Sequence, residues 1–335
     1  MATIRDVAKE AGVSIATVSH ILNNDEHYRV ATETRKRVFA ACEKLQYSVN
    51  SSYSKKRKTA GGIAVINNLT IEYQQDSYYL EILSYARTYL SARGYSLDLV
   101  QSQHDLNKPQ VLKALFDSGI TGLILFTTPS SATFQTLKEH IPYIVGINTS
   151  VQGIDNVGYD TYESGLKAMS FLVKNGHKRI SFIGGFISDD KKPRMERYDA
   201  YLSTMNAYGY AIEPEWIIES QWNGQICYEK TRQLLTSDKR PTAFFVASDN
   251  MAMACMSAIT RLGLKIPDDV SVIGISNVKE SRFFSPRLTT IAVSQKELGE
   301  CAADILIRRM TGDKTIVKQI YVPTKLIVRD SVKKI

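Results

Sequence analysis

The sequence predicts an α/β protein with two lobes built on parallel sheets, preceded by a small all-α helix-turn-helix domain. Three observations predict this fold. The first 60 residues hold eleven Lys and Arg against six Asp and Glu, whereas the other residues are nearly balanced in charge. Two short amphipathic segments flank a glycine near the N-terminus, as in a helix-turn-helix. Beyond residue 61, short apolar runs alternate with amphipathic stretches, which is typical of parallel sheets covered by helices.

Length and composition exclude several classes of protein. A chain of 335 residues, 44% hydrophobic and 23% charged, is typical of a globular protein with more than one domain. No apolar stretch is long enough for a membrane span, and the N-terminus lacks the apolar region of a secretory signal. The four cysteines are scattered singly, so no disulfide framework is indicated. We therefore expect a soluble cytoplasmic protein without a membrane partner.

Three helices are expected in the basic N-terminal domain. The first has apolar residues at helical spacing and ends before Gly12: Ile4, Val7, Ala8 and Ala11. Ser14 is a suitable N-cap for the second, whose buried face comprises Val18, Ile21 and Leu22. The third begins at N-cap Thr32, and we expect it to bury Val38, Phe39, Cys42 and Leu45.

The exposed face of the second helix carries the groups expected to contact DNA. A helix of this kind fits the major groove, where Ile15 and Ala16 suit thymine methyls and His20 can donate to a purine. Thr17 and Ser19 can bond phosphates. An αα-hairpin that merely packs is the alternative, and the net charge of +8, concentrated in this domain, favours a polyanion partner.

Residues 3–23, TIRDVAKEAGVSIATVSHILN, resemble the N-terminal motif of the lac/gal repressor family. The resemblance implies a DNA-binding domain over residues 1–47. Its base-reading positions fall on Ile15, Ala16 and His20. Its backbone contacts fall on Thr3, Arg5, Ser14, Thr17 and Ser19.

The linker over residues 48–61 departs from the family pattern, which has a proline and a minor-groove leucine where this chain has Val49 and Lys56. A lysine does not unstack bases as an apolar wedge does. We expect Lys55, Lys56 and Arg57 to contact DNA through charge without kinking it. A flexible basic linker is the alternative.

Apolar runs in the remaining residues predict strands, among them 63–66, 97–100, 122–126, 143–147, 180–183, 243–246 and 270–273. The family resemblance extends through this region, for example over 157–165, 266–274, 286–291 and 322–331. It implies a periplasmic-binding-protein-like body over 62–335 that binds the effector and dimerises. Lobe 1 would comprise about 62–159 plus 292–320, and lobe 2 about 160–291 plus 321–335.

The same resemblance implies an effector site between the lobes, formed by Asp160, Arg197, Trp222, Ser248, Asp249, Ser276 and Tyr79. A carboxylate such as Asp160 accepts sugar hydroxyls, the Arg197 fork donates to them, and Trp222 offers a flat apolar face. Each has a structural alternative: a helix N-cap for Asp160, a surface position for Arg197 and simple packing for Trp222.

The effector expected from the sequence is galactose or a related sugar. The lobe 1 wall resembles that of galactose-type repressors more than purine-type ones: Asn67, Asn68, Asp76, Tyr78 and Tyr79. Ser276 stands where many family members have Asp, which changes the hydroxyl pattern that the site satisfies. Ribose, a nucleoside or purine, or another carbohydrate are the alternatives.

Enzyme chemistry is not indicated. Ser52–Lys55 matches S-x-x-K and Ser248–Asn250 matches S-D-N, but no K-T-G accompanies them. The five histidines lack a recognised metal-binding spacing, and no cofactor or metal is expected. We expect a homodimeric transcription repressor that binds a double-stranded operator, because one recognition helix reads too few base pairs alone. A solute-binding protein and an architectural DNA binder without an effector are the other classes considered.

Overall fold

The computed structural model describes residues 4–22, 30–45, 62–67, 76–102, 105–106, 108–185 and 196–335. The chain divides into two compact units, residues 1–59 and 60–335. Each unit is described by itself. In the described ranges, no helix combines the length and apolar character of a membrane-spanning segment.

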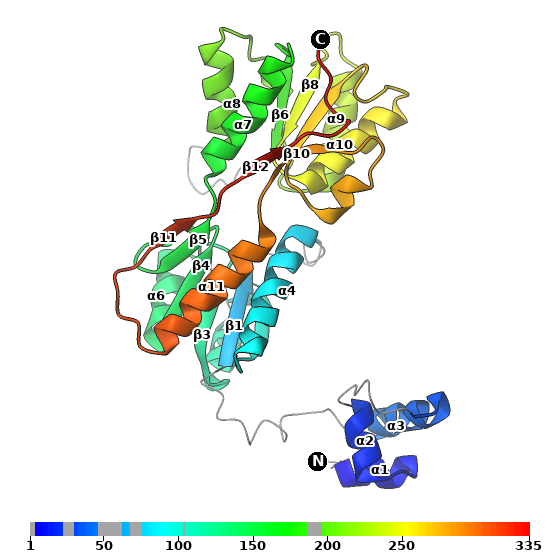
Figure 1. Ribbon diagram of the computed structural model, residues 1–335, viewed down its shortest axis with the longest axis vertical. Coiled ribbons are helices and arrows are strands. Elements are labelled where there is room, and N and C mark those ends of the chain that lie inside the picture. The colour runs from blue at the N-terminus through cyan, green and yellow to red at the C-terminus, as the bar shows by residue number, and fades with distance from the viewer. Residues whose placement is uncertain are drawn as a thin grey trace. The chain divides into compact units, whose positions relative to one another are not determined.

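The first unit contains three short helices (Figure 1), α1 Ile4–Ala11, α2 Ile15–Leu22 and α3 Thr32–Lys44. Gly12 ends α1 with a φ of +65°, a conformation that favours glycine, and the Val13 amide donates to the Ala8 carbonyl at 3.0 Å. The core of this unit combines residues from all three helices: Val7, Ala8, Ala11, Val18, Ile21, Val38 and Ala41. The helix-turn-helix predicted from the sequence is confirmed.

One residue expected in this core lies outside it. Phe39 is 50% exposed, whereas Val38 and Ala41 are buried and Cys42 and Leu45 are partly buried. The residues of α3 that face inward follow the spacing of 38, 41, 42 and 45, and Phe39 lies about 100° around the helix from Val38. The prediction that Phe39 is buried was therefore wrong.

The second unit has two lobes, each with a six-stranded sheet. The sheet of lobe 1 is parallel throughout, in the order β11-β5-β4-β3-β1-β2. Its strands are β1 Gly62–Asn67, β2 Leu97–Ser102, β3 Ile120–Leu125, β4 Tyr143–Ile147, β5 Asp155–Gly158 and β11 Gln319–Tyr321. Its helices are α4 Ser77–Ala92, α5 Pro109–Asp117, α6 Ser131–His140 and α11 Gln295–Met310.

The sheet of lobe 2 has the order β12-β10-β9-β8-β6-β7 and is parallel except for β12. Its strands are β6 Ile180–Gly184, β7 Ile217–Glu219, β8 Ala243–Val246, β9 Ser271–Ser276, β10 Thr289–Ala292 and β12 Lys325–Ile327. The helices of this lobe are α7 Thr161–Lys174, α8 Glu196–Ala207, α9 Gly224–Leu235 and α10 Asp249–Arg261. Two short 3-10 helices, η3 Pro214–Trp216 and η4 Lys279–Arg282, complete it.

Three connections join the lobes, after β5, after β10 and between β11 and β12 (Figure 1). All three leave the carboxyl ends of parallel strands, so those ends face the opposite lobe. Ligands of open α/β sheets bind at such carboxyl ends. The topology therefore directs attention to residues that follow the strands, among them Asn148, Tyr159 and Ser276.

Candidate DNA-binding and effector-binding sites

The residues predicted to contact DNA lie at the start of α2 and along its outer face. Ser14 precedes the helix, and its hydroxyl accepts a hydrogen bond from the Thr17 amide at 3.0 Å. Ile15 is 45% exposed although it is a large apolar residue, and Ala16 is also exposed. His20 lies on the same helix and is half-buried. An exposed isoleucine at a helix start is costly in water and suits contact with an apolar group.

The other residues that we expect to contact DNA lie elsewhere in the first unit or outside the described ranges. Arg5 is exposed on α1, and Ser19 is half-buried on α2. Lys44 at the end of α3 pairs with Glu10 of α1 at 2.6 Å, which ties the outer helices together. Thr3 and the linker residues Lys55, Lys56 and Arg57 lie outside the described residues.

In the second unit, Arg197 is the centre of a group of aromatic side chains. Its guanidinium lies over the rings of Tyr159 and Trp222, at 5.6 and 5.8 Å from their centroids, and its Nη2 donates to the Tyr159 hydroxyl. The Arg197 Nε is buried without a hydrogen-bond partner among the described residues. An unpaired buried N–H is unfavourable unless a ligand satisfies it.

Lobe 1 contributes two tyrosines to the same place. The ring of Tyr79 packs edge-on against those of Tyr78 and Phe126, at 5.2 and 5.9 Å. The Tyr78 hydroxyl accepts a hydrogen bond from the Asn148 amide at 3.0 Å. Burial, together with the negative charge of Asp76, raises the pKa of Tyr79 to about 12, so its hydroxyl stays protonated at neutral pH. We call the residues Asp76, Tyr78, Tyr79, Asn148, Tyr159, Arg197 and Trp222 the inter-lobe cluster.

The backbone conformation at Trp222 and its contact with Gly185 fix the position of the indole ring. Its φ is +58°, and the preceding Gln221 has a φ of +52°, so both residues occupy the left-handed region. The indole lies so close to Gly185 that a Cβ there would be 2.3 Å from its Cδ1. Strain of this kind persists where the surrounding structure fixes it, often at binding sites. Gly185, which directly follows β6, therefore makes room for the tryptophan.

Asp160 and Ser248 act as helix caps. The Asp160 carboxylate accepts a hydrogen bond from the Glu163 amide at 2.7 Å at the start of α7, and the side chain is otherwise exposed. The Ser248 hydroxyl accepts a hydrogen bond from the Met251 amide at 3.3 Å at the start of α10. For Asp160 the cap was the alternative that sequence reasoning left open, and its second oxygen has no hydrogen-bond partner among the described residues, so it remains for a ligand.

The Asp249 carboxylate has protein partners on both oxygens. It is fully buried, and it accepts hydrogen bonds from the Thr290 hydroxyl at 2.6 Å and the Val278 amide at 3.1 Å. Through them it fixes the segment after β9, where Ser276 has a φ of 126° and Asn277 one of 57°. The structure therefore gives Asp249 a positioning role beside the site rather than an open carboxylate within it.

Replacing Asp249 with asparagine is expected to remove a pH dependence of stability. Burial is the main cause that raises the pKa of Asp249 from 3.8 to about 6. Since the folded protein then binds the proton more tightly than the unfolded chain, stability falls as the pH rises from about 4 through about 6. A shift of about two units corresponds to ~3 kcal/mol. The Asp249→Asn amide retains both hydrogen bonds if Thr290 reverses its role.

Thermal unfolding of wild type and Asp249→Asn across this pH range measures the effect. The wild type is expected to lose stability relative to the variant with rising pH. Parallel pH profiles for the two proteins would show that the carboxylate ionises normally in the folded state.

The sequence analysis missed two side chains of the cluster, Tyr159 and Asn148, and a third beside it, Asn250. Tyr159 and Asn148 directly follow strands, and the carboxyl-end rule could have found them. Asn250 joins the lobes by donating to the Asp76 carboxylate at 2.8 Å, and its sequence position next to Asp249 gave no sign of this contact. Among the described residues, no group of three or more His, Cys, Asp or Glu could hold a metal ion.

Comparison with known proteins identifies the family. Residues 3–50 match the model described as "Bacterial regulatory proteins, lacI family", and residues 169–332 match that of the "Periplasmic binding protein-like domain". The "HTH-type transcriptional repressor PurR" of Histophilus somni is 36% identical over 344 residues, covering 99% of both chains. The chain belongs to the lacI family of bacterial regulatory proteins. This lacI-family protein is a DNA-binding transcription repressor.

Further relatives and structures agree with this assignment. The PurR of Mannheimia succiniciproducens is 34% identical over 341 residues, covering all of both chains. The regulator CelR in complex with cellobiose matches with a TM-score of 0.72 at 24% identity, over 99% of this chain and 100% of that one. The lac repressor dimer bound to operator and the anti-inducer ONPF matches with a TM-score of 0.70 at 23% identity, over 99% of both. These structures confirm the fold of a helix-turn-helix domain followed by a two-lobed periplasmic-binding-protein-like body.

The galactose-type resemblance requires correction. The full-length relatives just described are PurR repressors rather than galactose-operon repressors. The lobe 1 residues from which galactose was inferred do not decide the matter, because Tyr78 packs against Tyr79, and Tyr79 packs against Phe126. Such rings suit a flat heterocycle as well as a sugar.

Proposed function

We propose that this lacI-family repressor responds to a purine base or nucleoside held at the inter-lobe cluster. The observation that carries the proposal is Arg197, whose buried Nε lacks a partner among the described residues and whose guanidinium lies over the rings of Tyr159 and Trp222. The Hoogsteen edge of a purine presents neighbouring acceptors, N7 and a 6-oxo group, that match the fork of an arginine. The whole-length similarity to PurR repressors supports the same class of effector.

The remaining cluster residues fit a planar ligand. Trp222 and Tyr79 supply flat apolar faces, and Ser276 supplies a neutral hydroxyl where many family members carry a carboxylate. Asp160 would accept a ribose hydroxyl or a ring N–H with its free oxygen. Ser248 and Asp249 would orient α10 and the segment after β9. The relatives are repressors, which supports a regulator in the cytoplasm rather than an enzyme.

The test is a calorimetric titration of the full-length protein with adenine, guanine, hypoxanthine, their nucleosides, galactose and ribose. We expect saturable binding of at least one purine with one site per chain, and none of galactose. A response to a sugar alone would overturn the purine assignment. Absence of binding by every compound in the panel would also overturn it.

We further propose that two copies bind a pseudo-palindromic operator, with Ile15, Ala16 and His20 at base edges and Thr3, Arg5, Ser14, Thr17 and Ser19 on the backbone. The lac repressor dimer on its operator has the same fold. A dimer doubles the number of base pairs read, which one short helix alone does not supply.

Neutralising the linker is expected to flatten the salt dependence of operator binding. Lys55, Lys56 and Arg57, changed together to glutamine, should reduce the slope of log K against log salt by about 0.9 for each phosphate that is no longer neutralised. Fluorescence anisotropy at several salt concentrations measures the slope. A matched change of Lys314, which is exposed in the second unit, serves as a control. An unaltered slope in the linker variant would mean that the linker does not touch DNA.

A further inference from the structure

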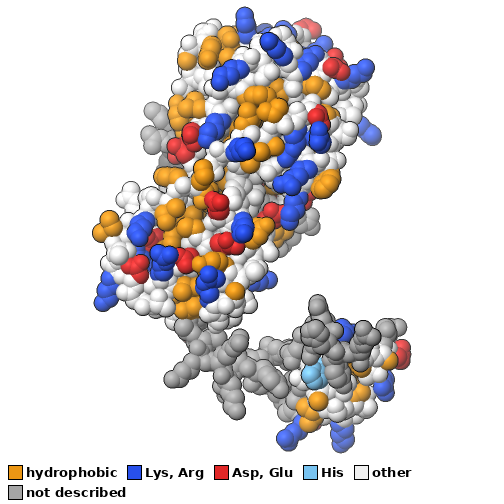
Figure 2. Space-filling view, in the orientation of Figure 1, with side chains coloured by type: hydrophobic (Ala, Val, Ile, Leu, Met, Phe, Trp, Pro, Cys, Tyr) orange, Lys and Arg blue, Asp and Glu red, His pale blue; other side chains and the backbone are white. Residues whose placement is uncertain are grey.

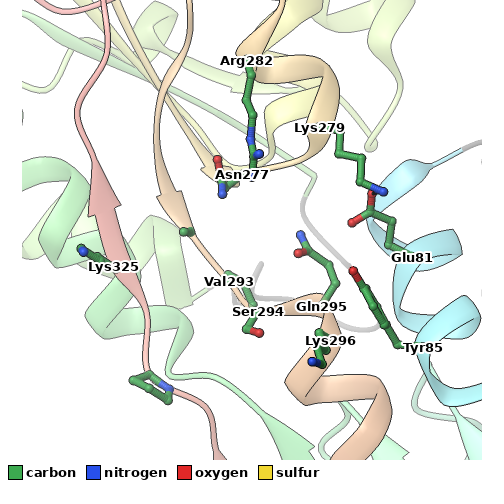
Figure 3. A pocket seen from close by; sticks show the side chains of 12 residues that line it. Glu81, Tyr85, Asn277, Lys279, Arg282, Val293, Ser294, Gln295, Lys296 and Lys325 are labelled. Carbon is green, nitrogen blue, oxygen red and sulfur yellow. Dashed lines mark ion pairs between the residues drawn. The ribbon is translucent and has the colours of Figure 1, made fainter. Parts of the chain in front are cut away.

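A cavity of about 380 Å³ lies between the lobes, apart from the inter-lobe cluster (Figure 3). None of the residues that line it belongs to the inter-lobe cluster. Its walls come from α4 and the start of α11 in lobe 1, from the segment after β9 in lobe 2, and from the connections between the lobes. The side chains that matter below are Glu81, Tyr85, Lys279, Arg282, Ser294 and Lys296.

The cavity has an excess of positive charge. Its lining contains Lys279, Arg282, Lys296 and Lys325 and a single carboxylate, Glu81. That carboxylate is already paired with Lys279 at 2.8 Å. Among the described residues, the side chains of Arg282 and Lys296 have neither an ion pair nor a hydrogen bond. The ammonium of Lys325 points away from the centre in Figure 3, so Arg282, Lys279 and Lys296 are the cations that define the space.

The surroundings increase this positive potential. Burial is the main cause that lowers the pKa of Arg329; the negative charge of Asp249 opposes this shift, and the positive charges of Arg282 and Arg287 add to it. Figure 2 shows a row of Lys and Arg side chains down one side of lobe 2 toward its border with lobe 1. Positively charged side chains without a carboxylate partner repel each other when they line the same cavity, and a bound anion reduces that repulsion.

Neutral donors complete the lining. Figure 3 shows the hydroxyl of Tyr85 directed into the space from α4, with Ser294 on the opposite side of Gln295. Ser294 is the N-cap of α11, a helix of 16 residues, so its first amides lie beside the same space. Hydroxyls, ammonium and guanidinium groups and helix amides together are the donors that bind phosphate oxygens. The volume is at the lower end of the range for small-molecule sites.

The geometry points to this cavity as a second ligand site, for a small molecule that carries a phosphate or diphosphate group. The anion contacts Arg282 and Lys279 from lobe 2 and Lys296 and Tyr85 from lobe 1. Because these groups belong to different lobes, the anion stabilises the lobe arrangement in which they lie close together. The site therefore gives the repressor an input that is separate from the effector at the inter-lobe cluster, and its existence does not depend on the identity of that effector.

The test is calorimetric titration of the full-length protein with inorganic pyrophosphate at constant ionic strength and without divalent cations. Saturable binding of one pyrophosphate per chain is expected. Arg282→Gln and Lys296→Gln should each weaken it about tenfold or more, since each removes a charge-assisted contact. Glu81→Gln should tighten binding, because it removes the carboxylate that competes for Lys279. This gain makes the result independent of any loss of folding.

Three controls locate the site. Lys314→Gln, on an exposed part of the second unit, should leave pyrophosphate affinity unchanged. So should Arg197→Met, in the inter-lobe cluster, and Arg5→Gln, in the first unit. Loss of pyrophosphate binding in any of these three variants would place the anion elsewhere and overturn the proposal. Non-saturable association, or equal affinity in the wild type, Arg282→Gln and Glu81→Gln, would show an unspecific charge effect only and would also overturn it.

Discussion

Replacing Arg197 with methionine is expected to weaken effector binding by about 10- to 100-fold. A hydrogen bond to a charged group contributes ~1.5–3 kcal/mol, and the guanidinium is the one group of the inter-lobe cluster with a buried N–H left unpaired among the described residues. Methionine preserves much of the volume between Tyr159 and Trp222, so the aromatic rings keep their packing. Calorimetry with the purine found in the panel gives the change in affinity.

Two further variants make this result specific. Arg197→Lys keeps the charge but loses the planar fork, and an intermediate affinity is expected. Arg261→Met removes an exposed arginine from the last turn of α10 and should have no effect. Thermal unfolding of each variant without ligand separates loss of binding from loss of folding. If a folded Arg197→Met protein bound the purine as tightly as the wild type, Arg197 would not be part of the effector site.

Replacing Arg309 with methionine is expected to destabilise the second unit by about 3–5 kcal/mol, the usual effect of leaving one member of a buried ion pair alone. Arg309 on α11 makes a two-pronged contact with Asp155 of β5, at 2.7 and 3.0 Å, and only 3% of the Asp155 side chain is exposed. Its guanidinium also donates to the carbonyls of Asp313, Thr315 and Ile316. The pair thus fixes the segment that leads from α11 to β11.

The adjacent arginine provides the matched control. Arg308 pairs with Asp304 at 2.7 Å, but 63% of its side chain is exposed, so Arg308→Met should cost less than about 1 kcal/mol. Denaturant unfolding followed by circular dichroism compares the two variants. Equal stability of Arg308→Met and Arg309→Met would contradict the structural role given to the Arg309–Asp155 pair.

Strands and helices with strong apolar patterns were predictable from the sequence. The runs 143–147 and 243–246 coincide with β4 and β8, and residues 4–11 coincide with α1. β5 was not predicted, because Asp155 and Asn156 interrupt it with polar side chains. Both are buried in the structure because hydrogen-bonding partners satisfy them: Arg309, far away in the sequence, for Asp155, and the nearby Val151 carbonyl for Asn156. Contacts of this kind depend on the tertiary fold.

In the candidate site, too, some residues were predictable from the sequence and others depend on the tertiary fold. The family pattern supplied Asp160, Arg197, Trp222 and Ser276, and the structure places Asp160 and Ser276 near the carboxyl ends of β5 and β9. The pattern did not distinguish Ser248, which caps α10, from its neighbour Asp249, whose carboxylate points into the core toward Thr290. Adjacent residues at a helix start face different directions, and only the packing of β9 and β10 decides which of them faces a ligand. The cationic cavity combines residues 81–85, 277–282, 292–296 and 323–325, and no motif in the sequence relates them.

The central claim is that a small molecule bound in the second unit controls the affinity of the first unit for DNA. Its most direct measurement is the operator dissociation constant of the full-length protein with and without a saturating purine, in wild type and in Arg197→Met. We predict a change of about 5- to 150-fold in the wild type, the usual range of allosteric coupling, and a smaller change in the variant at the same purine concentration. An operator affinity that stays the same while calorimetry shows the purine bound would contradict the account.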